Sequence, residues 1–248
     1  MKSFLMVIIL SVLGIANSPE SQFEKANKSY LSGNYKSAIE QYENVLGTGV
    51  ESPQLYYNLG NAYFRVGKPA NAILNYERAI KLDPGYADAI HNRTYVESQL
   101  PEQIVPITPF ILLEWWKLLS MSATQKMWAF VSAGVFFVLL VLFSGIVWFK
   151  GREFTRYLFY SSIFVALIFT LSVGLFAFRY YNDEFVVRGV VTIKGESVRA
   201  LPNPEAKETF KSVEGARIII VDEVGEWKQI KLLDGRIGWI EKIYIELL

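Results

Sequence analysis

Two long charge-free stretches, separated by only seven residues, constrain this 248-residue chain more than any other feature. Residues 127–149 and 157–178 contain no Asp, Glu, Lys or Arg. At about 1.5 Å of rise per residue, a helix of either length crosses a hydrocarbon core of about 30 Å. A soluble protein would need far more chain to cover two such helices. The sequence therefore predicts an antiparallel transmembrane hairpin in a lipid bilayer.

The turn between the two stretches indicates how the hairpin is oriented. Residues 150–156 include three basic side chains, and the positive-inside rule places such a turn in the cytoplasm. Neither stretch holds the intramembrane charge that an ion pathway needs. The stretches also carry small residues, which are either helix-packing contacts or ordinary positions: Ser132, Gly134, Gly145, Ser162, Ala166 and Gly174.

The N-terminus is typical of a secretory signal peptide spanning residues 1–18. Lys2 supplies a positive start, residues 4–15 form a short apolar run, and Ala16 and Ser18 offer cleavage sites. An uncleaved anchor or a buried helix is the competing interpretation. Export agrees with the basic turn, so we expect a bacterial inner-membrane protein whose soluble parts are both periplasmic.

A 34-residue period marks the region after the leader. The matching pairs are Ala26 and Gly60, Gly33 and Gly67, Ala38 and Ala72, and Tyr42 and Tyr76. This period is that of the tetratricopeptide repeat, a helix–turn–helix unit. We expect repeats at residues 19–52 and 53–86, followed by a capping helix at 87–100. Repeats of this type usually bind segments of other proteins, although a purely structural spacer is the alternative.

Amide side chains suggest where a partner binds to the repeats. The candidates on the first helices of the two repeats are Asn27, Tyr30, Gln54, Asn58, Asn61 and Arg65. They lie on another side of the helix from the packing stripe formed by residues such as Leu59 and Tyr63. An amide offers donors and an acceptor, which suits an extended peptide backbone. Merely solvated or capping amides are the alternative.

A linker at residues 101–126 precedes the hairpin. Prolines interrupt its first half, and residues 110–119 (FILLEWWKLL) are too few to span a membrane. With Trp115 and Trp116 they predict a short helix that lies in the membrane interface or packs against the repeats.

Residues 188–248 have the character of a small all-β domain. β-branched residues gather at 217–224, and Asp234-Gly235 predicts a tight hairpin turn. The motifs SVRALP and GWI resemble those of bacterial SH3 domains, with Ser197 where Asn is usual. Three aromatic residues either line a ligand groove or fill the core of an SH3-like barrel, namely Trp227, Trp239 and Tyr244.

Composition excludes several functions. The chain has no cysteine and a single histidine, His91, so thiol catalysis, disulfides and a multi-ligand zinc site are excluded. The formal net charge of +1 provides no basic face for nucleic acid. We expect no catalytic residue, metal or cofactor, and a multidomain membrane protein with all-α repeats, a two-helix hairpin and an SH3-like barrel.

The ordered combination of these parts carries a family resemblance. NLGNAYFRVG and AILNYERAIKLDPG, the WW-containing linker, the charge-free hairpin and the SH3-like tail resemble the BatE family, the tetratricopeptide-repeat members of the Bat (aerotolerance) operon proteins. The resemblance implies a scaffold whose partners are membrane proteins with von Willebrand factor A domains and a MoxR-type ATPase. A peptidoglycan sensor or tether acting through the SH3-like domain is the alternative function.

Overall fold

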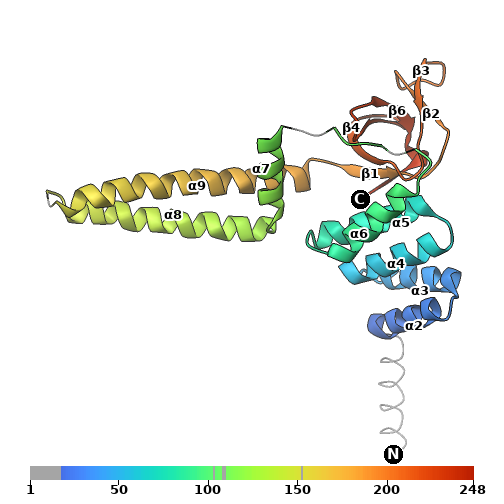
Figure 1. Cartoon of the computed structure of the whole chain (residues 1–248), viewed down its shortest axis with the longest axis horizontal. Coiled ribbons are helices and arrows are strands. Elements are labelled where there is room, and N and C mark those ends of the chain that lie inside the picture. The colour runs from blue at the N-terminus through green and yellow to red at the C-terminus, as the bar shows by residue number, and fades with distance from the viewer. Residues whose placement is uncertain (1–17, 103, 108–109, 152) are drawn as a thin grey trace, which may run out of the picture. The chain divides into compact units, whose positions relative to one another are not determined.

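The computed structural model describes residues 18–102, 104–107, 110–151 and 153–248 (Figure 1). The signal-peptide prediction falls almost wholly on residues outside these ranges. The chain divides into two compact units. One contains the repeats and the C-terminal sheet, residues up to 107 and 187–248, and the other contains residues 108–186.

The first part of the repeat unit is a stack of antiparallel helices. They are α2 (Pro19–Leu31), α3 (Tyr35–Gly47), α4 (Pro53–Arg65), α5 (Pro69–Leu82) and α6 (Ala87–Ser98). The first helix of each repeat begins at a serine cap followed by proline. Ser18 and Ser52 accept hydrogen bonds from backbone N–H groups three residues later, and a proline at the first turn loses no bond.

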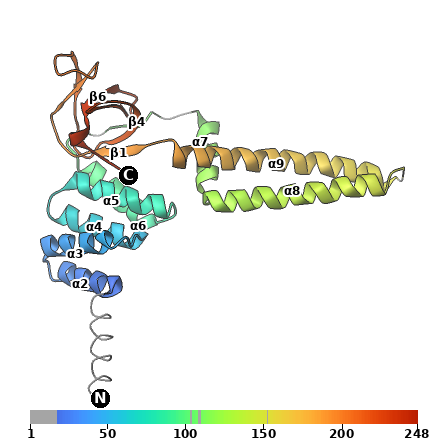
Figure 2. The same ribbon diagram turned by 180° about the vertical axis from the view of Figure 1, so that it is seen from behind.

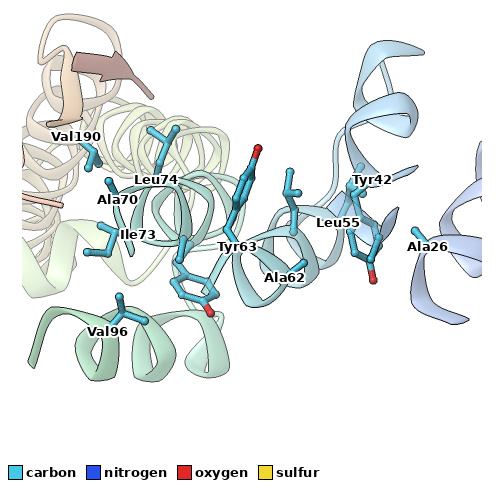
Figure 3. Packing of buried hydrophobic residues seen from close by; sticks show 14 of the residues in the cluster. Ala26, Tyr42, Leu55, Ala62, Tyr63, Ala70, Ile73, Leu74, Val96 and Val190 are labelled. Atoms are coloured by element: carbon cyan, nitrogen blue, oxygen red, sulfur yellow. The ribbon is translucent and has the colours of Figure 1, made fainter. Parts of the chain in front are cut away.

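Small residues let these helices approach closely. Ala26, Ala62 and Ala70 are buried in one cluster with larger side chains (Figure 3). At Gly60 a Cβ atom would lie 2.7 Å from the Tyr76 ring, so only glycine fits beneath that ring. Close packing of this kind is what the 34-residue period predicts.

The C-terminal part of the same unit is a seven-stranded antiparallel sheet with the order β3-β2-β6-β5-β4-β1-β7. Its strands are β1 (Arg188–Val191), β2 (Ser197–Arg199), β3 (Glu208–Lys211), β4 (Arg217–Val224), β5 (Trp227–Leu232), β6 (Ile237–Glu241) and β7 (Ile245–Leu247). Inward-facing aliphatic residues such as Val198, Ile218 and Ile230 form its core. The predicted turn at Asp234-Gly235 joins β5 to β6, and Gly235 has the positive φ of +90° that favours glycine there.

The second unit contains two long apolar helices, α8 (Gln125–Trp148) and α9 (Phe154–Glu184). Both are long and apolar enough to cross a membrane. They pair along their length, and the hydroxyl groups of Ser132 and Ser172 lie 3.2 Å apart between them. Helix α9 continues past the predicted span end at residue 178, where Arg179 and Asp183 form an ion pair one turn apart at 2.9 Å.

A short helix, α7 (Ile111–Met121), belongs to this second unit and packs on α9. Figure 1 and Figure 2, seen from opposite sides, both show α7 crossing the pair of long helices. A Cβ atom at Gly174 would lie 3.0 Å from the ring of Trp116, so the glycine admits the indole. The indole N–H of Trp128 donates to the Ser120 carbonyl at 2.9 Å and ties α8 to the end of α7. Of the predicted small-residue contacts, Gly174 is therefore used for packing, whereas Gly134 faces open space.

Candidate functional site

A cavity of about 310 Å³ lies between the first helices of the two repeats. Its lining residues are Asn27, Tyr30 and Leu31 of α2, Tyr42 of α3, and Asn58 and Asn61 of α4. Tyr42 is 1% exposed, so its ring belongs to the repeat core while its hydroxyl reaches the cavity. None of the lining side chains carries a charge at neutral pH. The site is thus a neutral groove built from amides, aromatic rings and one exposed leucine.

The first pair of amides, Asn27 and Asn58, is hydrogen-bonded to a tyrosine of the repeat core. Asn27 Oδ1 accepts a hydrogen bond from the Tyr42 hydroxyl at 2.6 Å and a second from Asn58 Nδ2 at 3.0 Å. Burial raises the pKa of Tyr42 to about 12, so its hydroxyl remains a proton donor at neutral pH. These two donors together fix the orientation of the Asn27 amide.

The same arrangement recurs one repeat later. Asn61 Oδ1 accepts from the Tyr76 hydroxyl at 2.7 Å and from Asn92 Nδ2 at 2.9 Å. Asn92 of α6 also donates to the Tyr57 hydroxyl at 3.2 Å. We call the four asparagines, Asn27, Asn58, Asn61 and Asn92, the amide ladder.

The amide ladder leaves polar groups available to a ligand. Over the described part of the chain, Asn27 Nδ2, Asn61 Nδ2 and Asn58 Oδ1 take part in no hydrogen bond. Amide N–H groups match carbonyl oxygens, and an amide oxygen matches a backbone N–H. The groove therefore has the chemistry to bind an extended peptide backbone.

Aromatic rings flank the ladder. Tyr30 lies edge-on to Tyr35 with 5.3 Å between ring centroids, and the Arg65 guanidinium sits 4.6 Å from the centre of the Tyr35 ring. Burial raises the pKa of the Tyr30 hydroxyl. Arg65 is thus engaged by an aromatic face beside the groove rather than pointing into it.

The structure brings together four of the six predicted partner-binding residues, namely Asn27, Tyr30, Asn58 and Asn61. Gln54 is exposed and does not line the cavity, and Arg65 is stacked on Tyr35. Tyr42, which is part of the groove, and Asn92, which is part of the ladder, were not among the residues predicted from the sequence. A signal for Asn92 existed, because it follows Asn58 by 34 residues.

The three aromatic candidates of the sheet do not form a comparable site. Trp239 is only 7% exposed, so its ring offers no free face to a ligand. Trp227 and Tyr244 are half-buried, and Trp227 pairs in register with Val224 next to the β4–β5 turn. His91 is exposed on α6. Within the described ranges, no three His, Asp or Glu side chains gather as a metal site.

Comparison with known proteins identifies the helical repeats. Two family descriptions match, "Tetratricopeptide repeat" over residues 53–86 and "TPR repeat" over residues 26–67. Tetratricopeptide repeats are therefore present, and that prediction is confirmed. Neither description is of an enzyme.

Two individual proteins are similar to part of this chain. The "Heat shock protein sti1 homolog" of Schizosaccharomyces pombe is 34% identical over 65 residues, which are 26% of this chain. The chain spans only 11% of that relative's length. A solved structure, "Second TPR of Spaghetti (RPAP3) bound to HSP90 peptide SRMEEVD", is 24% identical with a TM-score of 0.32. That match covers 36% of this chain and 82% of the other.

Proposed function

We propose that this protein is a membrane-anchored envelope scaffold that holds an extended segment of another protein in the groove of its repeats. The observation that carries the proposal is the bonded pair Asn27–Asn58, which lines the cavity and keeps a donor and an acceptor available. Tetratricopeptide repeats act as protein-interaction scaffolds, which supports this class of function.

Because the groove is neutral, it limits the kind of partner segment that can bind there. An acidic C-terminus calls for basic side chains, yet Phe23 and Asp88 stand where peptide-binding repeats of this type are expected to carry lysines. The guanidinium group of Arg65 is stacked on the ring of Tyr35. The bound segment is therefore held through its backbone, with apolar side chains against residues such as Leu31, which is 82% exposed.

The anchoring of the scaffold follows from the hairpin. We place α8 and α9 across the bacterial inner membrane, with the basic turn at residues 150–156 in the cytoplasm and the repeats and sheet in the periplasm. The signal peptide predicted from the sequence at residues 1–18 supports this topology. Helix α7 then lies at the outer interface, where Trp115, at 66% exposed, meets lipid.

We assign the sheet domain to the SH3-like barrel and the whole chain to the BatE family on the strength of the sequence motifs and the order of parts. On this basis the partners are membrane proteins with von Willebrand factor A domains, which link the scaffold to a cytoplasmic MoxR-type ATPase. A peptidoglycan tether is less well supported, because Trp239, one of its three candidate groove residues, is buried.

Substitution of Asn58 tests the groove more specifically than substitution of Asn27. Asn27→Ala would remove the hydrogen-bond acceptor of the Tyr42 hydroxyl, whereas Asn58→Ala leaves that bond intact. The matched control is Asn44→Ala, which removes an exposed amide from α3 outside the groove.

The assay is co-purification, in mild detergent, of a co-expressed von Willebrand factor A-domain Bat protein, with circular dichroism to verify folding. We expect Asn58→Ala to lose most of the captured protein and Asn44→Ala to retain it. Equal capture by both variants would contradict the groove as the binding site.

A further inference from the structure

The sheet and the repeats share a core. Val190 of β1 is 0% exposed and lies in the same cluster as Ile73 and Leu74 of α5 and Val96 of α6 (Figure 3). The C-terminal Leu248 packs against this cluster as well. A strand of the sheet thus completes the hydrophobic core of the repeats.

Charged groups border this shared core. Arg217 of β4 lies 3.0 Å from Glu77 of α5 and 2.7 Å from Glu97 of α6. Arg93 of α6 lies 2.7 Å from the same Glu77 carboxylate. The side chain of Glu77 is only 11% exposed, so this network is shielded from solvent more than a surface ion pair is.

The end of the chain adds a second set of bonds. Arg78 donates to the Leu247 carbonyl at 3.2 Å, and Lys81 donates to a Leu248 oxygen at 3.0 Å. Both donors belong to α5. Strand β7 and the residue after it are therefore hydrogen-bonded to α5, the second helix of the second repeat.

A glycine allows the close approach of the two parts. Gly215, with a φ of +81°, precedes β4, and a Cβ atom there would lie 3.0 Å from Ile73 Cδ1 and 3.1 Å from Leu100 Cδ1. A side chain at this position would push the sheet away from α5. The conformation and the contact both require glycine.

Helix α6 explains why the sheet docks here. Asn92 and Val96 follow Asn58 and Ala62 by 34 residues, so α6 occupies the place of the first helix of a third repeat. Among the described residues, α6 is not followed by the second helix of a repeat, because residues 104–107 run along the sheet instead. Ile107 N–H donates to the Leu233 carbonyl at 3.0 Å. A stack of repeats exposes apolar surface at its end unless something caps it.

We infer that the sheet domain is the cap of the repeat stack and occupies the position at which the second helix of a third repeat would pack. The hairpin of α8 and α9 is then an insertion between two parts of one folded body. The sheet contributes to partner binding by holding α6, and with it Asn92 of the amide ladder, in place. This inference does not depend on which partner the groove binds.

Hydrogen exchange on the full chain in detergent tests the cap. Arg217→Glu removes two ion pairs and puts a third carboxylate beside Glu77 and Glu97. The matched charge reversal is Lys228→Glu in β5, whose partner Glu223 lies within the sheet. In Arg217→Glu we expect amide exchange in α6 to rise about tenfold while β5 and β6 stay protected. In Lys228→Glu we expect exchange in α6 to stay at the wild-type rate. Unchanged exchange in α6 would overturn the cap.

A reciprocal variant covers the case in which Arg217→Glu loosens the sheet itself. Arg78→Glu lies on α5, outside the sheet, and places a carboxylate beside Glu246 and the Leu247 carbonyl. A cap requires faster exchange in β7, because that strand loses its fastening to the repeats. Wild-type exchange in β7 of this variant would refute the inference.

Discussion

The hydroxyl of Tyr42 lies 2.6 Å from Oδ1 of Asn27, and this bond joins the core of the first repeat to the surface of the groove. Because the ring is buried and the amide is half-exposed, folding of the repeat and presentation of the ligand-binding amide are coupled. A core residue therefore helps to set the binding chemistry.

Removing this hydroxyl should weaken the fold slightly and loosen the amide. We expect Tyr42→Phe to lower the free energy of unfolding by about 1 kcal/mol, the usual net worth of one intramolecular hydrogen bond. Thermal unfolding in detergent, followed by circular dichroism, measures this change. Tyr76→Phe, which removes the equivalent bond to Asn61, should cost a similar amount. A large loss in one variant and none in the other would contradict the equivalence of the two repeats.

Buried tyrosines should make the repeats sensitive to alkali. Burial raises the pKa of Tyr42 to about 12, and burial together with the bond to Glu51 raises that of Tyr56 to about 12, from an ordinary value of 10.0. The folded state thus retains protons that the unfolded state loses above pH 10. Stability is complete below pH 10 and should fall between pH 10 and 12.

The unfolding temperature measured from pH 8 to 12 reports this loss. The variant Tyr42→Phe has one fewer titrating group, so its unfolding temperature should fall less steeply above pH 10 than that of the wild type. Identical slopes would show that Tyr42 does not contribute to the alkaline transition.

Packing at Gly60 should tolerate no methyl group. A Cβ atom there would approach the Tyr76 ring to 2.7 Å and the Ala72 carbonyl oxygen to 3.2 Å. We expect Gly60→Ala to destabilise the repeats by about 1–3 kcal/mol through overpacking. Gly47→Ala is the control, since that position in α3 has nothing within 4 Å and alanine favours helix. If the Gly60→Ala variant were as stable as the Gly47→Ala variant, the tight contact at Gly60 would be ruled out.

The repeats could be predicted from sequence because their contacts recur with a fixed period. This period places Asn27 and Asn58 on the first helices of the two repeats as binding candidates, but it does not indicate the role of Tyr42 beneath them. The docking of the sheet on the repeats produces no periodic pattern in the sequence. Arg217 and Glu77 are 140 residues apart, and a single ion pair between non-repeating elements has no periodicity to reveal it. The two parts consequently looked independent, although they share a core.

The proposed topology predicts where fused reporters work. A reporter that is active only in the periplasm should function after Leu100 or Leu248 and fail at Gly151 in the basic turn, because the hairpin returns the chain to the side on which it entered. A reporter active only in the cytoplasm should give the reverse pattern at the same three sites. Periplasmic activity at Gly151 alone would invert the orientation.

Helix α7 should depend on one of its two adjacent tryptophans. The Trp116 ring fits against Gly174 of α9, whereas Trp115 is 66% exposed. We expect Trp116→Ala to weaken the packing of α7 by about 2 kcal/mol, less than the loss of a fully buried indole because the ring is half-buried. Trypsin cleavage at Lys117 in detergent should then accelerate, since the helix must open locally before it is cut. Trp115→Ala should be cleaved at the wild-type rate. Faster cleavage of Trp115→Ala than of Trp116→Ala would contradict the packing of α7 on Gly174.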